Sequence, residues 1–151
     1  MSDLSDLTFR AATAADAQGI RDLLQRSDLP TRDLSAGRPQ FVIAERAGRM
    51  IGIGALERFG TAALLRSVAI EPQWRGSGVG RLIIAELEQR ARAAGIDELI
   101  LLTLTARDFF ARLGYGSKLR GEVPAAVLGS AEFRSLCPAS AHCMAKSLAP
   151  T

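Results

Sequence analysis

The chain has 151 residues, a length typical of one domain and sufficient to bury a hydrophobic core without disulfides or a structural metal. Hydrophobic residues make up 48% of it, and the net charge is only +3, with the 19 lysines and arginines scattered rather than clustered. This composition indicates a globular protein, argues against nucleic-acid binding, and is compatible with an anionic small molecule or cofactor.

The N-terminus lacks the basic and apolar regions of a secretory signal, and the apolar stretches are too short or too interrupted to span a bilayer. We therefore expect a cytoplasmic protein with no membrane partner, forming a single domain over residues 1–151. The two cysteines, Cys137 and Cys143, are expected to be free thiols, as is usual in that compartment.

The first predicted elements are a short strand, Thr8–Ala11, and a helix. Thr13 is followed three residues later by Asp16, which indicates a capping box at the start of that helix. The helix ends near Ser27 and has one apolar face. That face consists of Ala17, Ile20, Leu23 and Leu24.

Three segments with strand character come next and predict an antiparallel meander. These are Phe41–Glu45, Met50–Leu56 and Ala62–Ile70. The turns between them contain Gly48 and Gly60, and Pro72 ends the third strand.

Helical periodicity then runs from Val79 to Ala94, with Gly95 as its C-terminal cap. A strand is predicted over Glu98–Leu102, and Thr105 with Asp108 indicates a second capping box, for a short helix that ends at Gly114. Small helical turns are predicted at Pro124 and over Ala131–Leu136, and Ala141–Leu148 is expected to close the sheet. The order of elements indicates an α+β fold with helices on both faces of the sheet.

The main chemical signal is a glycine-rich loop between the third meander strand and the long helix. Gly76, Gly78 and Gly80 alternate with other residues just where the helix begins. Glycines let successive backbone N–H groups converge on one anion, and the helix N-terminus adds about half a positive charge. The loop lacks the Lys-Ser/Thr pair of a P-loop and the spacing of the dinucleotide fingerprint. It is either a pyrophosphate cradle or a connection without a ligand.

The pattern Arg75-x-x-Gly78-x-Gly80, preceded by Val68-Ala69-Ile70, resembles the acetyl-coenzyme A motif of the GNAT superfamily of N-acetyltransferases. Phe109–Tyr115 is similar to that family's second landmark, an aromatic helix that ends in Gly plus an aromatic residue. The resemblance covers nearly the whole chain. It implies a GNAT-like mixed, mostly antiparallel sheet and acetyl-CoA as cosubstrate. The resemblance allows a homodimer, but no residue here demonstrates one.

The resemblance also implies roles for individual residues. The backbone of Val68 and Ile70 would pair with the pantetheine arm, and an amide near Ala69 would polarise the thioester carbonyl. Phe109 lies near the cofactor or in the core, and Arg81 contacts a phosphate or is solvated. The pyrophosphate would be held by the amides of Arg75, Gly76, Ser77, Gly78, Val79 and Gly80.

Transfer to an amine needs a base, for which Glu57 is the first candidate and Glu71 the second. Each is otherwise a surface acid beside a turn. The family's usual proton donor to the thiolate, a tyrosine, is replaced here by Phe110. Water or the hydroxyls of Thr103 and Thr105, at the substrate end of the site, remain as donors.

The chemical class of the acceptor is indicated by Arg66, a charged residue within an apolar strand. It either extends from an edge to solvent or anchors a substrate carboxylate. Arg107, Lys118 and Arg120 would add to such an anchor. This set favours an acidic or amino-acid acceptor over a polyamine or an aminoglycoside, which would require acidic walls.

A narrower resemblance links Leu101–Ala106, Asp108-Phe109-Phe110 and Ser135–Met144 to the arsenic-resistance N-acetyltransferases, which are related to amino-acid N-acetyltransferases. It implies a small amine acceptor, such as an organoarsenical amino acid. Cys137 and Cys143 suggest a second hypothesis, a soft-ligand site for arsenic, but their spacing is not that of a zinc site and no metal is expected. A non-catalytic acetyl-CoA-binding domain and a peptide N-acetyltransferase are the remaining candidate functions.

Overall fold

The computed structural model describes residues 4–27, 29, 39–130, 133 and 141–148. Its strands are β1 (Thr8–Ala11), β2 (Gln40–Arg46), β3 (Arg49–Phe59), β4 (Ala62–Ile70), β5 (Glu98–Thr103), β6 (Gly116–Ser117) and β7 (His142–Ser147). Its helices are α1 (Ala17–Arg26), α2 (Val79–Ala93), α3 (Arg107–Arg112) and α4 (Ala125–Leu128), with 3₁₀ turns η1 (Ala14–Asp16), η3 (Pro72–Trp74) and η4 (Arg120–Glu122).

Within the described residues the strands form one seven-stranded sheet in the order β1-β2-β3-β4-β5-β7-β6. Among these described pairs, only β4 and β5 run parallel, and the others are antiparallel. The predicted α+β fold with a mixed, mostly antiparallel sheet is therefore confirmed. The meander is confirmed as well, although β3 extends three residues beyond its predicted end at Leu56.

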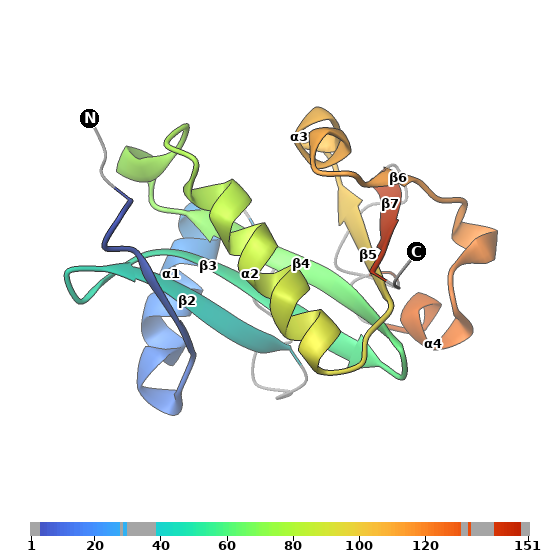
Figure 1. The fold of residues 1–151 in the computed structure, drawn as a ribbon, viewed down its shortest axis with the longest axis horizontal. Coiled ribbons are helices and arrows are strands. Elements are labelled where there is room, and N and C mark those ends of the chain that lie inside the picture. Colours follow the sequence, from blue (N-terminus) through green and yellow to red (C-terminus); the bar gives the residue numbers. More distant parts are fainter. Residues whose placement is uncertain (1–3, 28, 30–38, 131–132, 134–140, 149–151) are drawn as a thin grey trace.

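Helices cover both faces of the sheet (Figure 1). On one face, α2 buries Val79, Ile83 and Leu87 against apolar residues such as Leu65 and Leu99. On the opposite face, α1 packs Leu23 and Leu24 against β2 and β3, and α4 packs Val127 against β4 and β5. In Figure 1, α2 crosses in front of the sheet and α1 lies behind it.

Two glycines of β3 allow α2 to approach the sheet closely. A Cβ at Gly52 would lie 2.7 Å from Ile83 Cδ1, and a Cβ at Gly54 would lie 2.7 Å from Leu87 Cδ1. Real Cβ atoms do not come this close to a neighbour in a packed core. The two glycines within the predicted strand Met50–Leu56 therefore set the depth of helix packing.

One predicted capping box is confirmed and the other is wrong. The Asp16 carboxylate accepts the Thr13 amide at 2.7 Å, at the start of η1, which leads into α1. The short helix α3, however, begins at Arg107 with Ala106 as its N-cap, and no Thr105–Asp108 box forms in this described segment. Thr103, the last residue of β5, takes over the cap because its Oγ1 accepts the Ala106 amide at 2.9 Å.

The C-terminal predictions are confirmed where the structure describes them. Pro124 precedes α4, and β7 closes the sheet as expected for Ala141–Leu148. The helical turn expected over Ala131–Leu136 lies outside the described residues, apart from Phe133.

Candidate active site

Strands β4 and β5 separate toward their C-terminal ends. Their parallel pairing covers only Ala62–Leu64 against Glu98–Ile100. Beyond this, β4 continues to Ile70 and β5 to Thr103 without pairing with each other, and the two strands diverge in Figure 1. Because strand backbones must hydrogen-bond, this open side of β4 is suited to an extended ligand that pairs with it.

A β-bulge lies at the start of the unpaired part of β4. Ala55 pairs with Arg66 and Ile53 with Ala69, so Gly54 faces two residues of β4, Ser67 and Val68. Ser67 has a φ of 58°, in the left-handed region that non-glycine residues rarely occupy. The bulge changes which way the following peptide groups point, a property that recurs beside functional sites.

The loop from Glu71 to Gly80, here called the cradle loop, joins the end of β4 to α2. Gly76 and Gly78 have φ values of 78° and 96°, which require glycine, and Gly78 is the N-cap of α2. A Cβ at Gly76 would meet nothing within 4 Å, so the backbone is open to an approaching group.

The amides of the cradle loop and of the first turn of α2 differ in whether they have a partner within the protein. Those of Trp74, Arg75 and Ser77 donate to loop carbonyl oxygens at 2.8–3.3 Å. Within the described part of the chain, no protein acceptor is found for five amides around the start of α2, at a helix N-terminus that carries partial positive charge. These are the amides of Gly76, Gly78, Val79, Gly80 and Arg81. Such a set is what a phosphate or pyrophosphate binds, so the loop fits the predicted cofactor group.

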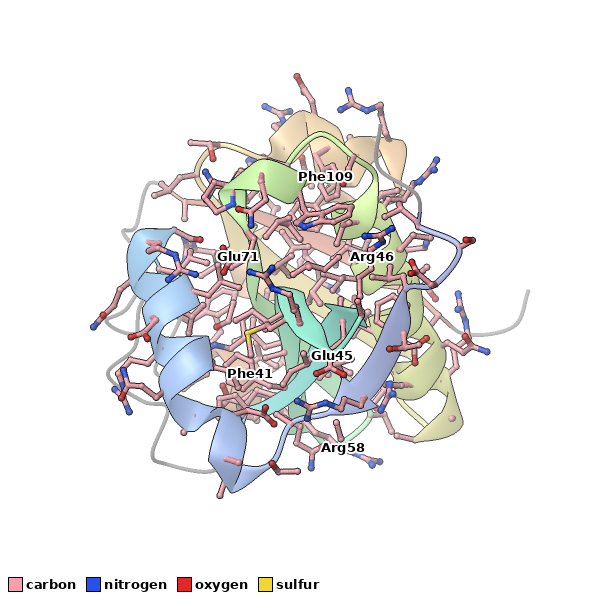
Figure 2. The ribbon with its side chains drawn as sticks, turned by 90° about the vertical axis from the view of Figure 1, so that its left-hand side faces the viewer. Phe41, Glu45, Arg46, Arg58, Glu71 and Phe109 are labelled. Atoms are coloured by element: carbon pink, nitrogen blue, oxygen red, sulfur yellow. The ribbon has the colours of Figure 1, made fainter. Side chains whose placement is uncertain are left out.

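Apolar and cationic side chains enclose the cradle loop. The Arg46 guanidinium lies 5.4 Å from the centre of the Trp74 ring, and the Phe109 ring lies against Gly80, 3.5 Å from the position of a Cβ there. Figure 2 views the molecule from this side, with the labels of Arg46, Glu71 and Phe109 around the light-green loop. Phe109 is therefore both packed and next to the cradle, and Arg81 is exposed on the first turn of α2.

The structure brings Glu57 and Arg66 together. Arg66 Nη1 lies 3.1 Å from Glu57 Oε1, and Arg66 Nε donates to Ser67 Oγ at 3.2 Å. Both residues are buried, at 4% and 2% exposed. The descriptions of Glu57 as a surface acid beside a turn and of Arg66 as an edge residue reaching solvent are therefore wrong. The pair lies in the central hairpin β3–β4, and Glu57 stands opposite Leu64, the last residue of β4 paired with β5.

The other predicted polar residues are dispersed. Glu71 forms an ion pair with Arg26 of α1. Thr103 is partly buried and caps α3 through its hydroxyl, whereas Thr105 is exposed. Within the part of the chain that the structure describes, neither threonine hydrogen-bonds to Glu57 or Arg66, so only the latter two are grouped at the opening between the strands.

Phe110 and Tyr115 lie in the core beneath α2. The Phe110 ring is 8% exposed and contacts both Phe109 and Tyr115 edge-on. Tyr115 donates its hydroxyl to Glu88 Oε2 at 2.8 Å, and Lys146 Nζ binds the same carboxylate at 3.1 Å. Burial raises the pKa of Tyr115 well above its usual range, followed by the effect of the Glu88 charge. Tyr115 is thus a core residue.

Glu88 and Lys146 were not recognised from the sequence. The available signal was that Glu88 follows Ile84 by four residues and therefore falls on the apolar stripe of α2. A carboxylate at such a position needs a buried partner, and here it has two.

A cavity of about 460 Å³ lies at the far edge of the sheet, beside β6 and β7. His142 Nε2 is 2.8 Å from Ser117 Oγ there, and burial raises the pKa of the Cys143 thiol. Cys137, the other half of the suggested arsenic site, lies outside the described residues. Among the described residues, no cluster of three or more potential metal ligands occurs, and no helix is long and apolar enough to cross a membrane.

The comparisons with known proteins agree on one family. Residues 37–116, slightly more than half of the chain, match the family model described as Acetyltransferase (GNAT) domain. An amino-acid acetyltransferase of Aeromonas salmonicida is 34% identical over 115 residues, which is 70% of this chain and 26% of that protein. An uncharacterized N-acetyltransferase of Chlorobaculum tepidum is 36% identical over 77 residues, or 50% of this chain and 48% of that one. The chain thus spans about a quarter to a half of these relatives.

Solved structures share the fold. N-acetylglutamate synthase from Neisseria gonorrhoeae, complexed with coenzyme A and N-acetyl-glutamate, superposes with a TM-score of 0.82 at 22% identity, over 95% of this chain and 35% of that one. Rv2747 from Mycobacterium tuberculosis, in complex with CoA and NLQ, superposes with a TM-score of 0.79 at 26% identity, over 94% and 99% of the two chains. With the matched family model and this shared fold, the chain belongs to the acetyltransferase (GNAT) domain family.

Proposed function

We propose that this protein is an acetyl-CoA-dependent N-acetyltransferase that acetylates the amine of a small amino-acid-like acceptor by direct transfer. The observation that carries the proposal is the set of unpaired amides in the cradle loop, placed beside the separated ends of β4 and β5. Similarity to proteins named amino-acid acetyltransferase supports the acceptor class.

The residues for the cosubstrate follow from this geometry. Of the predicted cradle amides, those of Gly76, Gly78, Val79 and Gly80 would hold the pyrophosphate, with Arg81 near the same end of α2, whereas the amides of Arg75 and Ser77 donate within the loop. The free side of β4 over Val68, Ala69 and Ile70 would pair with the pantetheine arm, and Phe109 would line the adjoining wall.

Acetyl-CoA supplies an activated acetyl thioester, and the protein must supply a route for two protons. We assign the first to Glu57, which would take the proton of the acceptor ammonium, directly or through water. The new C–N bond then forms as the C–S bond breaks. The nitrogen loses its second proton as the C–N bond forms, and this proton passes to the departing thiolate through water or the Thr105 hydroxyl, because Phe110 has no proton to donate and Tyr115 donates to Glu88. Glu71 is the second candidate for the base, and its carboxylate, like that of Glu57, is paired with an arginine, here Arg26.

The Arg66–Glu57 pair supports an amino acid as acceptor. In an amino acid, one carbon separates the amine from the carboxylate, so a base and a carboxylate anchor must lie side by side. Glu57 and Arg66 meet this requirement, with 3.1 Å between their nearest charged atoms. An organoarsenical amino acid is the narrower proposal, supported by the resemblance of Leu101–Ala106 and Ser135–Met144 to the arsenic-resistance branch.

The proposal includes the setting of the reaction. We propose that residues 1–151 form one domain that acts in the cytoplasm on a small molecule, without a nucleic-acid or membrane partner. A homodimer is compatible with this scheme.

The main competing function is that of a domain that binds acetyl-CoA without transferring the acetyl group. It is favoured by one observation, the placement of Phe110 in the core where a tyrosine would be expected near the thiolate. The test is the steady release of free CoA thiol from acetyl-CoA in the presence of an amine panel containing acidic amino acids, organoarsenical amino acids, a peptide N-terminus and a polyamine. Amino-acid-dependent turnover is expected. Tight CoA binding without turnover on any amine would contradict catalysis and support the binding domain.

A further inference from the structure

The last turn of α1 is tied to the cradle loop by two arginines. Arg26, the last residue of α1, forms an ion pair with Glu71, the first residue of the loop. Arg75 donates from Nη2 to Ser27 Oγ at 3.5 Å and from Nε to the Ile70 carbonyl oxygen at 3.2 Å. The two ties to α1 join residues 45 and 48 positions apart in the chain.

We infer that Arg26 is a positioning residue for cofactor binding, which acts through Glu71 to hold the cradle loop in its anion-binding form. The inference rests on the proposed function and extends it, because it gives the end of α1 a part in binding acetyl-CoA. It also gives Glu71 the role of a tether in place of that of a base.

The bonds within the loop shape it without fixing its position. The amides of Trp74, Arg75 and Ser77 all bind carbonyl oxygens of the loop itself. The loop is attached to the rest of the protein by the Glu71 amide, which donates to the Ile51 carbonyl oxygen at 2.9 Å, by the Trp74 ring under Arg46, by the Phe109 ring against Gly80 and by the Arg75–Ser27 bond. The Arg26–Glu71 pair adds an attachment on the side of α1.

Because the Arg26–Glu71 pair is partly exposed, its loss should affect the cradle loop rather than the stability of the whole domain. Its side chains are 50% and 19% exposed, and ion pairs of this kind contribute little to global stability. Binding of an anion to several amides at once, however, depends on the fraction of molecules in which those amides are already aligned. Removing the tether lowers that fraction and weakens binding without altering the acetyl-transfer step.

The experiment compares Arg26→Gln, Glu71→Gln and the double variant with a matched control pair. Glu86 and Arg90 form a similarly exposed ion pair on α2, with side chains 24% and 37% exposed, and neither has a described contact with the cradle loop. Three quantities are measured: the Kd for CoA by calorimetry, kcat and KM for acetyl-CoA, and hydrogen exchange of the loop amides without ligand.

We expect each single variant to weaken CoA binding about two- to fivefold, the range that a partly exposed ion pair supplies. The double variant should match the single ones, since either change breaks the same pair. In Arg26→Gln the KM for acetyl-CoA should rise with kcat unchanged, exchange of the amides of residues 75–81 should accelerate, and Glu86→Gln should behave as the wild type.

Two results would overturn the inference. One is unchanged CoA affinity and unchanged loop exchange in Arg26→Gln. The other is a large loss of kcat in Glu71→Gln that Arg26→Gln does not share, which would identify Glu71 as the base. A wild-type protein that fails to bind CoA would instead contradict the proposed function, and the exchange measurement would still decide whether Arg26 orders the loop.

Discussion

Arg66 and Glu57 meet inside the central hairpin of the sheet, with 3.1 Å between Arg66 Nη1 and Glu57 Oε1 and with neither side chain appreciably exposed. A buried pair of this kind is costly to desolvate and is retained only where its geometry is well satisfied. Here it lies where β4 and β5 begin to separate, and Arg66 also binds Ser67 at the bulge. The pair therefore places the candidate base, Glu57, and the candidate anchor, Arg66, where the separating strands open the site.

Glu57→Gln should reduce the rate of acetyl transfer by about a hundredfold or more, the usual contribution of a general base. The loss should be partly rescued at high pH, where more of the acceptor amine is already neutral. The pH dependence of kcat/KM checks this, with CoA affinity as the control. An unchanged pH–rate profile would exclude Glu57 as the base.

Arg66→Met should lower the free energy of unfolding by about 3–5 kcal/mol, because it removes the Arg66 cation from the buried Glu57 carboxylate. The double variant Arg66→Met/Glu57→Leu should recover much of this loss, since both charges are then removed. Urea denaturation of Arg66→Met, Glu57→Leu and the double variant provides the double-mutant cycle. Additive losses would mean that the two side chains do not stabilise each other.

Tyr115→Phe should lower the free energy of unfolding by about 1–3 kcal/mol, since Glu88 loses a hydrogen bond to its buried carboxylate. The rate of acetyl transfer should be unchanged, because Tyr115 lies in the core. A large loss of kcat at unchanged stability would instead identify Tyr115 as the proton donor to the thiolate.

The stability of the wild type should also fall in alkali. The folded-state pKa of Tyr115 is raised above its unfolded value near 10, so its contribution is fully present below pH 10 and is lost as the pH rises further. Denaturation midpoints at neutral pH and above pH 10 check this, and the loss should be smaller in Tyr115→Phe. An equal loss in both proteins would contradict the assignment.

Much of the fold could be predicted from the sequence because its periodicities are clear. The meander, α2 and the closing strand follow from alternating and helical patterns and from Gly95 and Pro72. The exception was the cap of α3, which is provided by the hydroxyl of Thr103 and not by that of Thr105. Local spacing cannot decide between two nearby hydroxyls.

The site was predictable in part. The glycine loop was identified from its spacing, and the hairpin register explains why Glu57 and Arg66 meet, since a turn at Gly60 puts both on one face of β3 and β4. From the sequence the two residues were assigned separate roles, and their pairing was missed. The separation of β4 from β5 and the contacts of Glu88 and Arg26 depend on long-range packing, which no local pattern encodes.

The central claim is that the cradle loop holds the pyrophosphate of acetyl-CoA, and calorimetric titration of CoA into Gly78→Glu tests it most directly. Gly60→Glu is the matched control, because Gly60 also has a positive φ, of 69°, and lies in the distant β3–β4 turn. Both variants carry the same added charge and similar backbone strain. We predict that the wild type and Gly60→Glu bind CoA with equal affinity while the folded Gly78→Glu does not bind. Equal affinity in all three proteins would contradict the claim.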